Sequence, residues 1–458
     1  MYAGRKNVMD IPMKNRSILF ASIGVALLLC GAQVVGSTTM VLSSLVLYMM
    51  LLVWCCWHDY TFPVLLFFLP WSPIMRLSPS SFSIYTIGLV LICLISIFKN
   101  HFSFRGYQIK AGLMIMVLSL VSKLLDGSSL TFDYVAFLMM IIIFPTVMQE
   151  YNKQQYDFLH GVVFLSLGII IAALCAMHFE EYANIRKFVR VDSYLTIVRR
   201  SGFYSDPNFY VAQILAALSG VLALILQEKK GKKLVFLGIV ALFLIYCGFL
   251  SGSKSFVLTF ALILLLWVGA IIKMRGRIGA RVVLLAFLTC TVIFIATSTI
   301  FSDLIVVIMT RFSYTSNMDS FTTGRTQLWQ NYISEILSNM KVFFLGKGFT
   351  NINVNGRASH NTIIQIFYQF GILGVPVIAY WIMCFFKEMR NVNNQRTRFN
   401  ITLFMVGIGA FLPWLAIDTL FFDEFFLFQM YMCLAINRFG QASLSIKEKS
   451  CKFNMEIS

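Results

Sequence analysis

Residues 356–386 read GRASHNTIIQIFYQFGILGVPVIAYWIMCFF, a polar turn set directly against a long apolar run. The run has roughly the length, about 20 residues, that crosses the hydrocarbon core of a bilayer. The stretch therefore predicts a membrane-spanning helix. It also places a histidine, His360, at the point where that helix enters the membrane.

The composition of the chain extends this prediction to the whole sequence. Of the 458 residues, 59% are hydrophobic and 12% are charged, with a mean hydropathy of +0.79, whereas a soluble chain carries about 25% charged residues. We therefore expect an all-α polytopic membrane bundle of about 12–14 transmembrane helices, built as a single integral membrane domain over residues 1–458. Apolar blocks predict spans near 17–36, 38–57, 62–75, 83–98, 108–125, 130–148, 157–177, 209–226, 233–250, 254–273, 281–301, 361–386, 399–420 and 422–437. The third and last of these spans are short.

We attribute the formal net charge of +17 to membrane topology and to contact with anionic lipid, and not to nucleic-acid binding. Every second short connection is basic, which fits the positive-inside rule with both termini in the cytoplasm. The basic residues of these connections are Arg5, Lys6, Lys14 and Arg16; Lys229, Lys230, Lys232 and Lys233; Lys273, Arg275, Arg277 and Arg281; and Arg390, Arg396 and Arg398. We expect no nucleic-acid partner and close contact with membrane lipid.

Cysteine and histidine spacing predicts no metal centre and no cofactor. The ten cysteines lie mostly inside apolar spans without a CxxC pair, which is typical of small buried hydrophobes. Among the five histidines no pair has metal-ligand spacing, and His178 with Glu180 and Glu181 comes nearest. The first apolar run is long and is followed at once by another, so we interpret it as a retained span rather than a signal peptide.

The predicted topology leaves two long loops on the outer face, residues 178–207 and 302–360. The first loop ends in IVRRSGFYSDPNFY. Asp206 before Pro207 is typical of a helix N-cap and first turn, although a carboxylate here could also serve as a base. Arg199 and Arg200 form a basic pair just before a membrane entry, and they are either solvated cations or ligands of an anion.

The second loop contains TTGRTQLWQNYISEILSN, which predicts an amphipathic helix capped by Thr322 or Thr323. Its apolar face rests either on the membrane or on the bundle. Arg325 falls in or beside the first turn, where a cation is unfavourable unless an anion lies nearby. Arg325 therefore indicates an anionic ligand, unless it is a plain surface arginine.

Neither the short turn SGSKS nor the stretch rich in glycine and asparagine before His360 is a nucleotide-binding loop. Both lack the glycine spacing that such a loop requires. Lys254 in that turn is either a snorkelling cation at a helix end or a ligand of an anion. We expect His360 in the first turn of a long helix, where the positive helix end disfavours imidazolium. A neutral imidazole facing cations has the properties of a general base, and the alternative is a structural histidine.

The chain resembles the O-antigen ligase and polysaccharide polymerase superfamily of multi-span membrane glycosyltransferases. The resemblance covers residues 195–386 and is carried, in order, by RRSGFYSDPNFY, SGSKS, TGRTQLW, LGKGF and SHNTIIQIFYQFGILG. It implies an inverting, metal-independent enzyme of the bacterial cytoplasmic (inner) membrane, with 302–360 as its outer catalytic loop. The enzyme would move a glycan from an undecaprenyl-diphosphate carrier to an acceptor sugar hydroxyl, a glycan or a lipid-linked acceptor. A flippase and a chain-length regulator are the protein partners that the resemblance implies.

The resemblance assigns roles to individual residues. His360 matches the family's catalytic base, and Arg325 matches a catalytic, diphosphate-binding arginine. Arg200, with Arg199 beside it, and Lys254 match further diphosphate ligands. Lys254 departs from the arginine that the resemblance leads us to expect, and a lysine lacks the two-pronged contact of a guanidinium. A lipid-linked-oligosaccharide flippase or another polytopic transporter is the alternative function, and the sequence leaves polymerase and ligase open.

Overall fold

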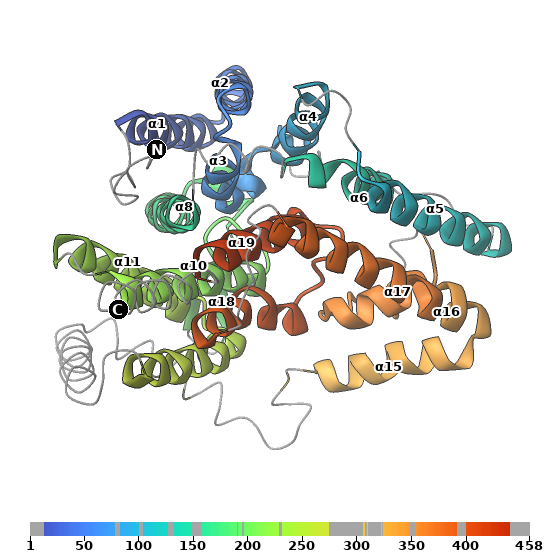
Figure 1. Cartoon of the computed structure of the whole chain (residues 1–458). Helices are drawn as coiled ribbons and strands as arrows, with labels where there is room; N and C mark the ends of the chain where they lie inside the picture. Colours follow the sequence, from blue (N-terminus) through green and yellow to red (C-terminus); the bar gives the residue numbers. More distant parts are fainter. Residues whose placement is uncertain are drawn as a thin grey trace, which may run out of the picture.

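The chain is an all-α helical bundle of a multi-pass membrane protein, and 84% of the residues that the structure describes are helical, with almost none of them in strands. The computed structural model describes residues 13–77, 83–99, 104–126, 132–147, 157–189, 191–194, 197–228, 231–273, 306, 309, 322, 324–348, 353–391 and 400–439. The prediction of fold class is confirmed. Figure 1 shows how these helices are arranged.

The helices follow one another with short connections in much of the described chain. The α-helices are α1 (Met13–Val35), α2 (Thr38–Trp57), α3 (Thr61–Phe68), α4 (Ile84–Lys99), α5 (Gly106–Asp126), α6 (Phe132–Ile143), α8 (Phe158–Phe179), α9 (Ala183–Arg186), α10 (Pro207–Gln227), α11 (Gly231–Leu250), an unlabelled helix at Lys254–Lys273, α15 (Arg325–Ser338), α16 (Met340–Leu345), α17 (Thr362–Asn391), α18 (Ile401–Phe411) and α19 (Asp423–Phe439). The 3₁₀ turns are η1 (Leu69–Ile74), η2 (Phe144–Val147) and η3 (Leu412–Ala416). One hairpin pairs β1 (Val191–Tyr194) antiparallel with β2 (Ile197–Arg200).

Within the described residues, 8 helices are long and apolar enough to cross a membrane, and four shorter apolar helices accompany them. The predicted span 281–301 lies outside the described residues. The predicted spans 62–75, 130–148 and 399–420 correspond to three of the shorter apolar helices, and each changes from α-helix to a 3₁₀ turn, at η1, η2 and η3. A proline lies at each change, at Pro70, Pro145 and Pro413, and proline cannot donate the backbone hydrogen bond that would continue an α-helix.

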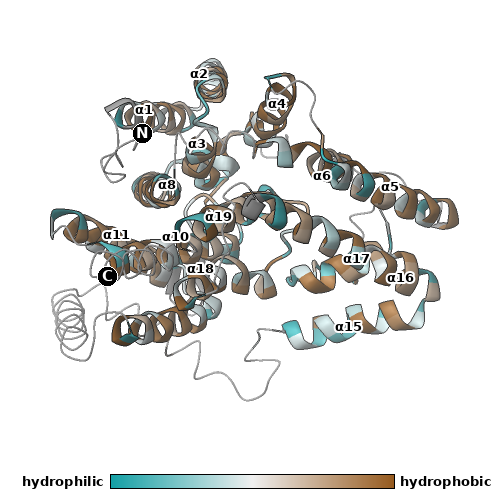
Figure 2. Cartoon of the chain, viewed as in Figure 1, coloured by the Kyte–Doolittle hydropathy of each residue, from teal (hydrophilic) through white to brown (hydrophobic). Residues whose placement is uncertain are grey.

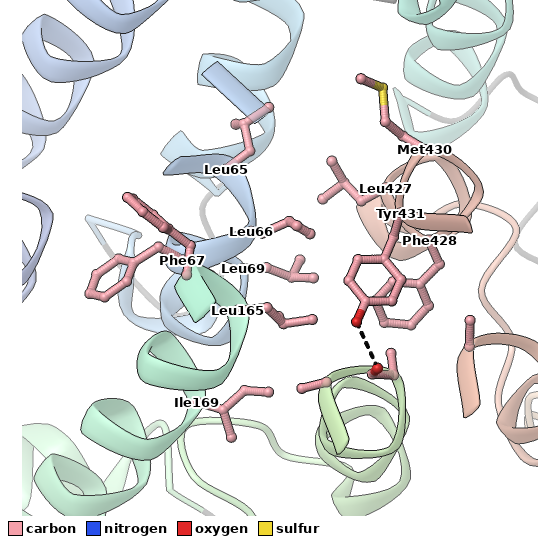
Figure 3. Close-up of a cluster of buried hydrophobic side chains, with 14 of the residues drawn as sticks. Leu65, Leu66, Phe67, Leu69, Leu165, Ile169, Leu427, Phe428, Met430 and Tyr431 are labelled. Atoms are coloured by element: carbon pink, nitrogen blue, oxygen red, sulfur yellow. Dashed lines mark hydrogen bonds between the residues drawn. The ribbon is translucent and has the colours of Figure 1, made fainter. Parts of the chain in front are cut away.

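The centre of the bundle is α10, and 89% of the residues in its most apolar stretch are buried inside the protein. It contacts α8, α11 and α18, and small residues allow the close approach that packs helices in membranes. A Cβ added to Gly220 would meet the Tyr431 hydroxyl at 2.0 Å, and one added to Gly409 of α18 would meet Ser219 at 2.2 Å. The Tyr431 hydroxyl donates to the Ala216 carbonyl at 2.9 Å (Figure 3). The core is therefore rigid beneath the N-terminus of α10.

Helix α15 differs from the rest of the bundle. It lies along the edge, beside α16 and α17 (Figure 1), and Figure 2 shows it as largely hydrophilic, with scattered hydrophobic residues. Its buried residues are Leu328, Tyr332 and Ile336, which pack on Val342 and Tyr368 of α16 and α17. The predicted amphipathic helix is present, and its apolar face covers the protein.

The long helix α17 is broken at Gly371, which has φ 59° and ψ −176°. A Cβ there would meet the Phe344 carbonyl oxygen at 2.4 Å, so only glycine fits. The break leaves backbone carbonyls without intrahelical donors. Lys347 N and Gly348 N bond the carbonyls of Tyr368 and Gln369 at 2.8 and 3.0 Å. The start of α17 is thus an independent short segment, tied to the end of α16.

Candidate functional site

Four helices begin around one open cleft of about 610 Å³, called here the cationic cleft. The first residues of α10, of the helix Lys254–Lys273 and of α15 line it, and so does His360, which precedes α17. Each helix N-terminus carries a partial positive charge and unpaired backbone N–H groups. The arrangement of the main chain alone therefore favours an anion in the cleft.

Four basic side chains line the same cleft: Arg199, Lys254, Arg325 and Arg357. They come from β2, from the SGSKS turn, from the start of α15 and from the loop before α17. Cations and helix N-termini act in the same direction on a bound anion. Three of the four cations are sequence-predicted site residues that lie far apart in the chain.

The SGSKS turn is fixed by hydrogen bonds that also hold Arg199. Arg199 Nε donates to the Ser251 carbonyl at 2.9 Å, and Gly252 at φ 57° makes the tight turn. Ser253 Oγ donates to Asn208 Oδ1 at 3.0 Å, which joins the turn to the first residues of α10. Lys254 and Arg199 are therefore carried on one connected frame.

Arg200 is not among the residues that line the cationic cleft. Its guanidinium makes a two-pronged ion pair with Glu180, with Nη2 2.7 Å from Oε1 and Nε 3.0 Å from Oε2. This pairing is the largest cause of a raised pKa of Arg200. Successive residues of a strand point to opposite faces, so when Arg199 faces the cleft Arg200 faces away. The sequence could not distinguish the two neighbours.

Asp206 is a helix N-cap, one of the two roles that the sequence left open, and it also lies near His360. As N-cap of α10, its Oδ1 accepts from Asn208 N and from Asn208 Nδ2, both at 2.8 Å. Its Oδ2 lies 3.7 Å from His360 Nδ1. That distance exceeds a direct hydrogen bond. A capping carboxylate thus also faces the candidate base.

His360 lies before α17 rather than in its first turn, where the sequence analysis expected it. Asn361 is the cap, because its Oδ1 accepts from Ile363 N and Ile364 N at 3.0 and 3.3 Å. His360 itself has φ 49°, a left-handed conformation that is uncommon outside glycine. Such strain persists only where the surroundings impose it, and it gathers at functional sites.

The residue that imposes this conformation is Asp418, which is 8% exposed. Its Oδ1 accepts from the Asn361 backbone N–H at 2.8 Å and from the Ser359 hydroxyl. The carboxylate therefore clamps the residues on both sides of His360. Thr362 reinforces the clamp, because its hydroxyl donates to the Ile417 carbonyl at 2.7 Å. The connection between α18 and α19 thus sets the geometry of the candidate base.

Helix α15 holds the loop 353–360 from the opposite side. Trp329 Nε1 donates to the Ser359 carbonyl at 3.0 Å. Burial raises the pKa of Tyr332 to about 12, so its hydroxyl stays protonated and donates to the Arg357 carbonyl at 2.7 Å. The aromatic residues of α15, interpreted from sequence as an apolar face, also fasten the loop that carries Arg357 and His360.

Arg325 stands at the start of α15, as expected. The N-cap of α15 is Gly324 rather than the predicted Thr322, although the Thr322 hydroxyl accepts from Thr326 N at 3.1 Å. Thr323 lies outside the described residues. Gly324, which directly precedes Arg325, has φ 79° and makes the turn into the helix. This turn brings Arg325 into the cleft at the N-terminus of α15. A cation is unfavourable at that end of a helix unless an anion lies nearby.

Sequence reasoning missed two residues of the site. Arg357 stands three residues before His360 in the opening stretch, and its basic charge beside a candidate base was an available signal. Asp418 gave no such signal, because it lies in an acidic connection 57 residues after its partner Asn361. Among the described residues, no group of three or more His, Cys, Asp or Glu side chains could hold a metal ion.

No protein-family model matches the sequence, and a search of curated proteins finds no significant relative.

Proposed function

We propose that this protein is a membrane glycosyltransferase that moves a glycan from a polyprenyl-diphosphate carrier, undecaprenyl diphosphate in bacteria, to a sugar hydroxyl on the outer face of the cytoplasmic membrane. The observation that carries the proposal is the cationic cleft. There, four cations and four helix starts meet His360 and Asp206, in a bundle of apolar helices. A lipid diphosphate is an anion held at a membrane surface, and this cleft has the matching charge and place.

The proposed reaction is a single displacement. The acceptor oxygen forms a bond to the anomeric carbon while the bond from that carbon to the diphosphate oxygen breaks, and the diphosphate leaves with the electron pair. His360 takes the hydroxyl proton, and Asp206 at 3.7 Å stabilises the imidazolium that forms. Arg325, Arg357 and Lys254 stabilise the charge that develops on the departing oxygens. Attack opposite the leaving group inverts the anomeric centre.

The cations and the candidate base of the cleft suit a diphosphate leaving group. Diphosphate is already a good leaving group, so the transition state needs cations more than a general acid. The cleft supplies four of them and one base. No specific observation favours the alternative function, a flippase or other transporter.

Analysis of surface glycans in a deletion strain tests the proposal. Loss of long chains with single repeat units still attached identifies a polymerase. Loss of all attached chains, with polymer still on the carrier, identifies a ligase. Accumulation of lipid-linked glycan on the cytoplasmic side would instead identify a flippase, and an unchanged glycan profile would contradict the proposal.

A further inference from the structure

A second cleft, of about 840 Å³, adjoins the cationic cleft. The two share one lining residue, Asp206, whose Oδ2 faces His360. The second cleft lies between α4, α6 and the start of α19, with residues of η1 and of the segment before α10 completing it. A ligand bound there would lie beside Asp206, the residue whose Oδ2 is 3.7 Å from His360 Nδ1.

The polar wall of the second cleft carries two adjacent carboxylates at the start of α19. Glu424, 3% exposed, accepts from the Tyr204 hydroxyl and from Gln213 Nε2, both at 3.1 Å. Asp423 Oδ2 accepts from the Thr86 hydroxyl at 2.8 Å. A carboxylate accepts several hydrogen bonds, so Asp423 keeps acceptor capacity for a further hydroxyl.

The wall also carries donors and aromatic rings. Arg76 and Lys187 line it together with hydroxyls of the serines Ser72, Ser83 and Ser205, and with rings that include Phe422. Alternating donors, acceptors and apolar ring faces suit a saccharide, whose hydroxyls both donate and accept and whose C–H faces are apolar. The carboxylates Asp423 and Glu424 share the wall with the cations Arg76 and Lys187, so this wall carries both signs of charge and lacks the excess of cations that lines the cationic cleft.

The other end of the second cleft is aliphatic and open. Ile87 of α4 is 45% exposed, and Val135 and Met139 of α6 are 41% and 39% exposed. Exposed aliphatic side chains on apolar helices of a membrane protein face lipid. The cleft thus has a polar end at Asp206, Asp423 and Glu424 and an aliphatic end along α4 and α6.

We infer that the second cleft binds a lipid-linked saccharide, the acceptor of the transfer, with its sugar against Thr86, Asp423 and Glu424 and its lipid along α4 and α6. This assignment rests on the proposed function. The cationic cleft then holds the donor diphosphate, and the two substrates meet at Asp206 and His360. An acceptor hydroxyl approaches from the side away from the cations, as an inverting displacement requires.

Protection of a cysteine at the rim tests the assignment without any turnover. Lys187→Cys places the probe in the second cleft at an exposed position, and Glu181→Cys is the matched control on the same loop, exposed but in neither cleft. The full-length protein is reconstituted in phosphatidylcholine vesicles and treated with an impermeant maleimide. The probes are the lipid-linked repeat unit extracted from producing cells and the same saccharide released from its lipid by mild acid.

We expect the lipid-linked saccharide to slow labelling at position 187 but not at 181, and the free saccharide to protect only at higher concentration. Thr86→Val in the Lys187→Cys background should weaken protection about fivefold, the value of one hydrogen bond, while Thr86→Ser should keep it. Equal protection by plain phosphatidylcholine, or none by either saccharide, would overturn the assignment. Protection that Thr86→Val leaves unchanged would overturn the placement of the sugar.

The outcome is separate from that of the proposed function. If the unmodified protein transfers no glycan but the lipid-linked saccharide protects position 187, the proposed function fails and the saccharide site stands. If transfer occurs without protection, the site assignment fails alone.

Discussion

At the scale of single residues, two observations on His360 favour a catalytic over a structural histidine. Its backbone is left-handed at φ 49°, and strain of this kind gathers at functional sites. Four basic side chains line the cleft that it faces. Asp206 Oδ2 lies 3.7 Å from its Nδ1, close enough to stabilise an imidazolium.

The first prediction concerns that base. His360→Ala should lower transfer by roughly 10²-fold or more while donor binding is nearly kept, because a general base acts mainly in the transition state. His360→Gln keeps a similar polar shape without a titratable base and should fail as well. Turnover of purified protein with lipid-linked donor and acceptor measures both. Wild-type turnover in His360→Gln would assign His360 a structural role and make Asp206 the next candidate base.

Arg325 carries the second prediction. Arg325→Ala should reduce transfer by about 10²- to 10³-fold, the range for loss of one preorganised donor to a developing negative charge. Arg325→Lys should rescue only in part, because a point charge cannot reproduce a two-pronged contact. Detergent-extracted protein of both variants should elute as the wild type does on size exclusion, which controls for folding. Full activity of both variants would mean that Arg325 is a surface residue.

Arg200 gives a prediction in which the structure and the sequence resemblance differ. Because the guanidinium is paired with Glu180 outside the cleft, Arg200→Glu should impair the protein by placing two carboxylates together. Exchanging the charges, with Glu180→Arg added, should restore much of the transfer activity. If Arg200 instead bound the diphosphate directly, the double variant Arg200→Glu, Glu180→Arg would stay inactive, because a carboxylate at position 200 would repel the diphosphate.

At the scale of elements, the connection between α18 and α19 is a support for the loop that carries His360. Asp418→Asn should lower the turnover number more than it changes the KM for donor, because it loosens the clamp without touching the cationic cleft. Ser359→Ala removes the other half of the same contact, so the double variant should lose little more than the worse single variant. If the double variant of the purified protein lost turnover by the product of the two single losses, Asp418 would act independently of Ser359.

The same scale shows what the sequence could and could not predict. Spans, the α15 helix and the cap at Asp206 follow from local periodicity and from residues one to four positions apart. Gly371, which breaks α17, and Pro145, which changes a helix to a 3₁₀ turn, were visible as residues, but their effect depends on what packs against them. The pairing of Arg200 with Glu180 and of Asn361 with Asp418 joins distant segments, and no local pattern reports such contacts.

At the scale of the whole molecule, the two clefts require a defined orientation in the membrane. Both clefts are built around the starts of helices. The cationic cleft lies at the starts of α10, Lys254–Lys273 and α15 and at the residue before α17, and the second cleft lies at the start of α19. The basic connections counted in the sequence lie at the other ends of several of these helices, for example after Gln227 and after Lys273. With positive charge retained in the cytoplasm, the positive-inside rule predicts that the clefts lie on the outer face.

Labelling of intact cells checks this orientation. Asn353→Cys lies on the loop before His360 and Lys232→Cys lies at the start of α11, and both positions are exposed. An impermeant maleimide should label the first and not the second, because the bilayer separates them, and both should react once the membrane is permeabilised. The described native cysteines are buried apart from half-buried Cys384, so the unmodified chain provides the background. Labelling at position 232 but not at 353 would place the clefts in the cytoplasm, where a carrier-linked glycan is assembled before it crosses. That result would remove the topological basis of the proposed transfer, since polymerisation or ligation on the outer face needs the base and the cations on that side.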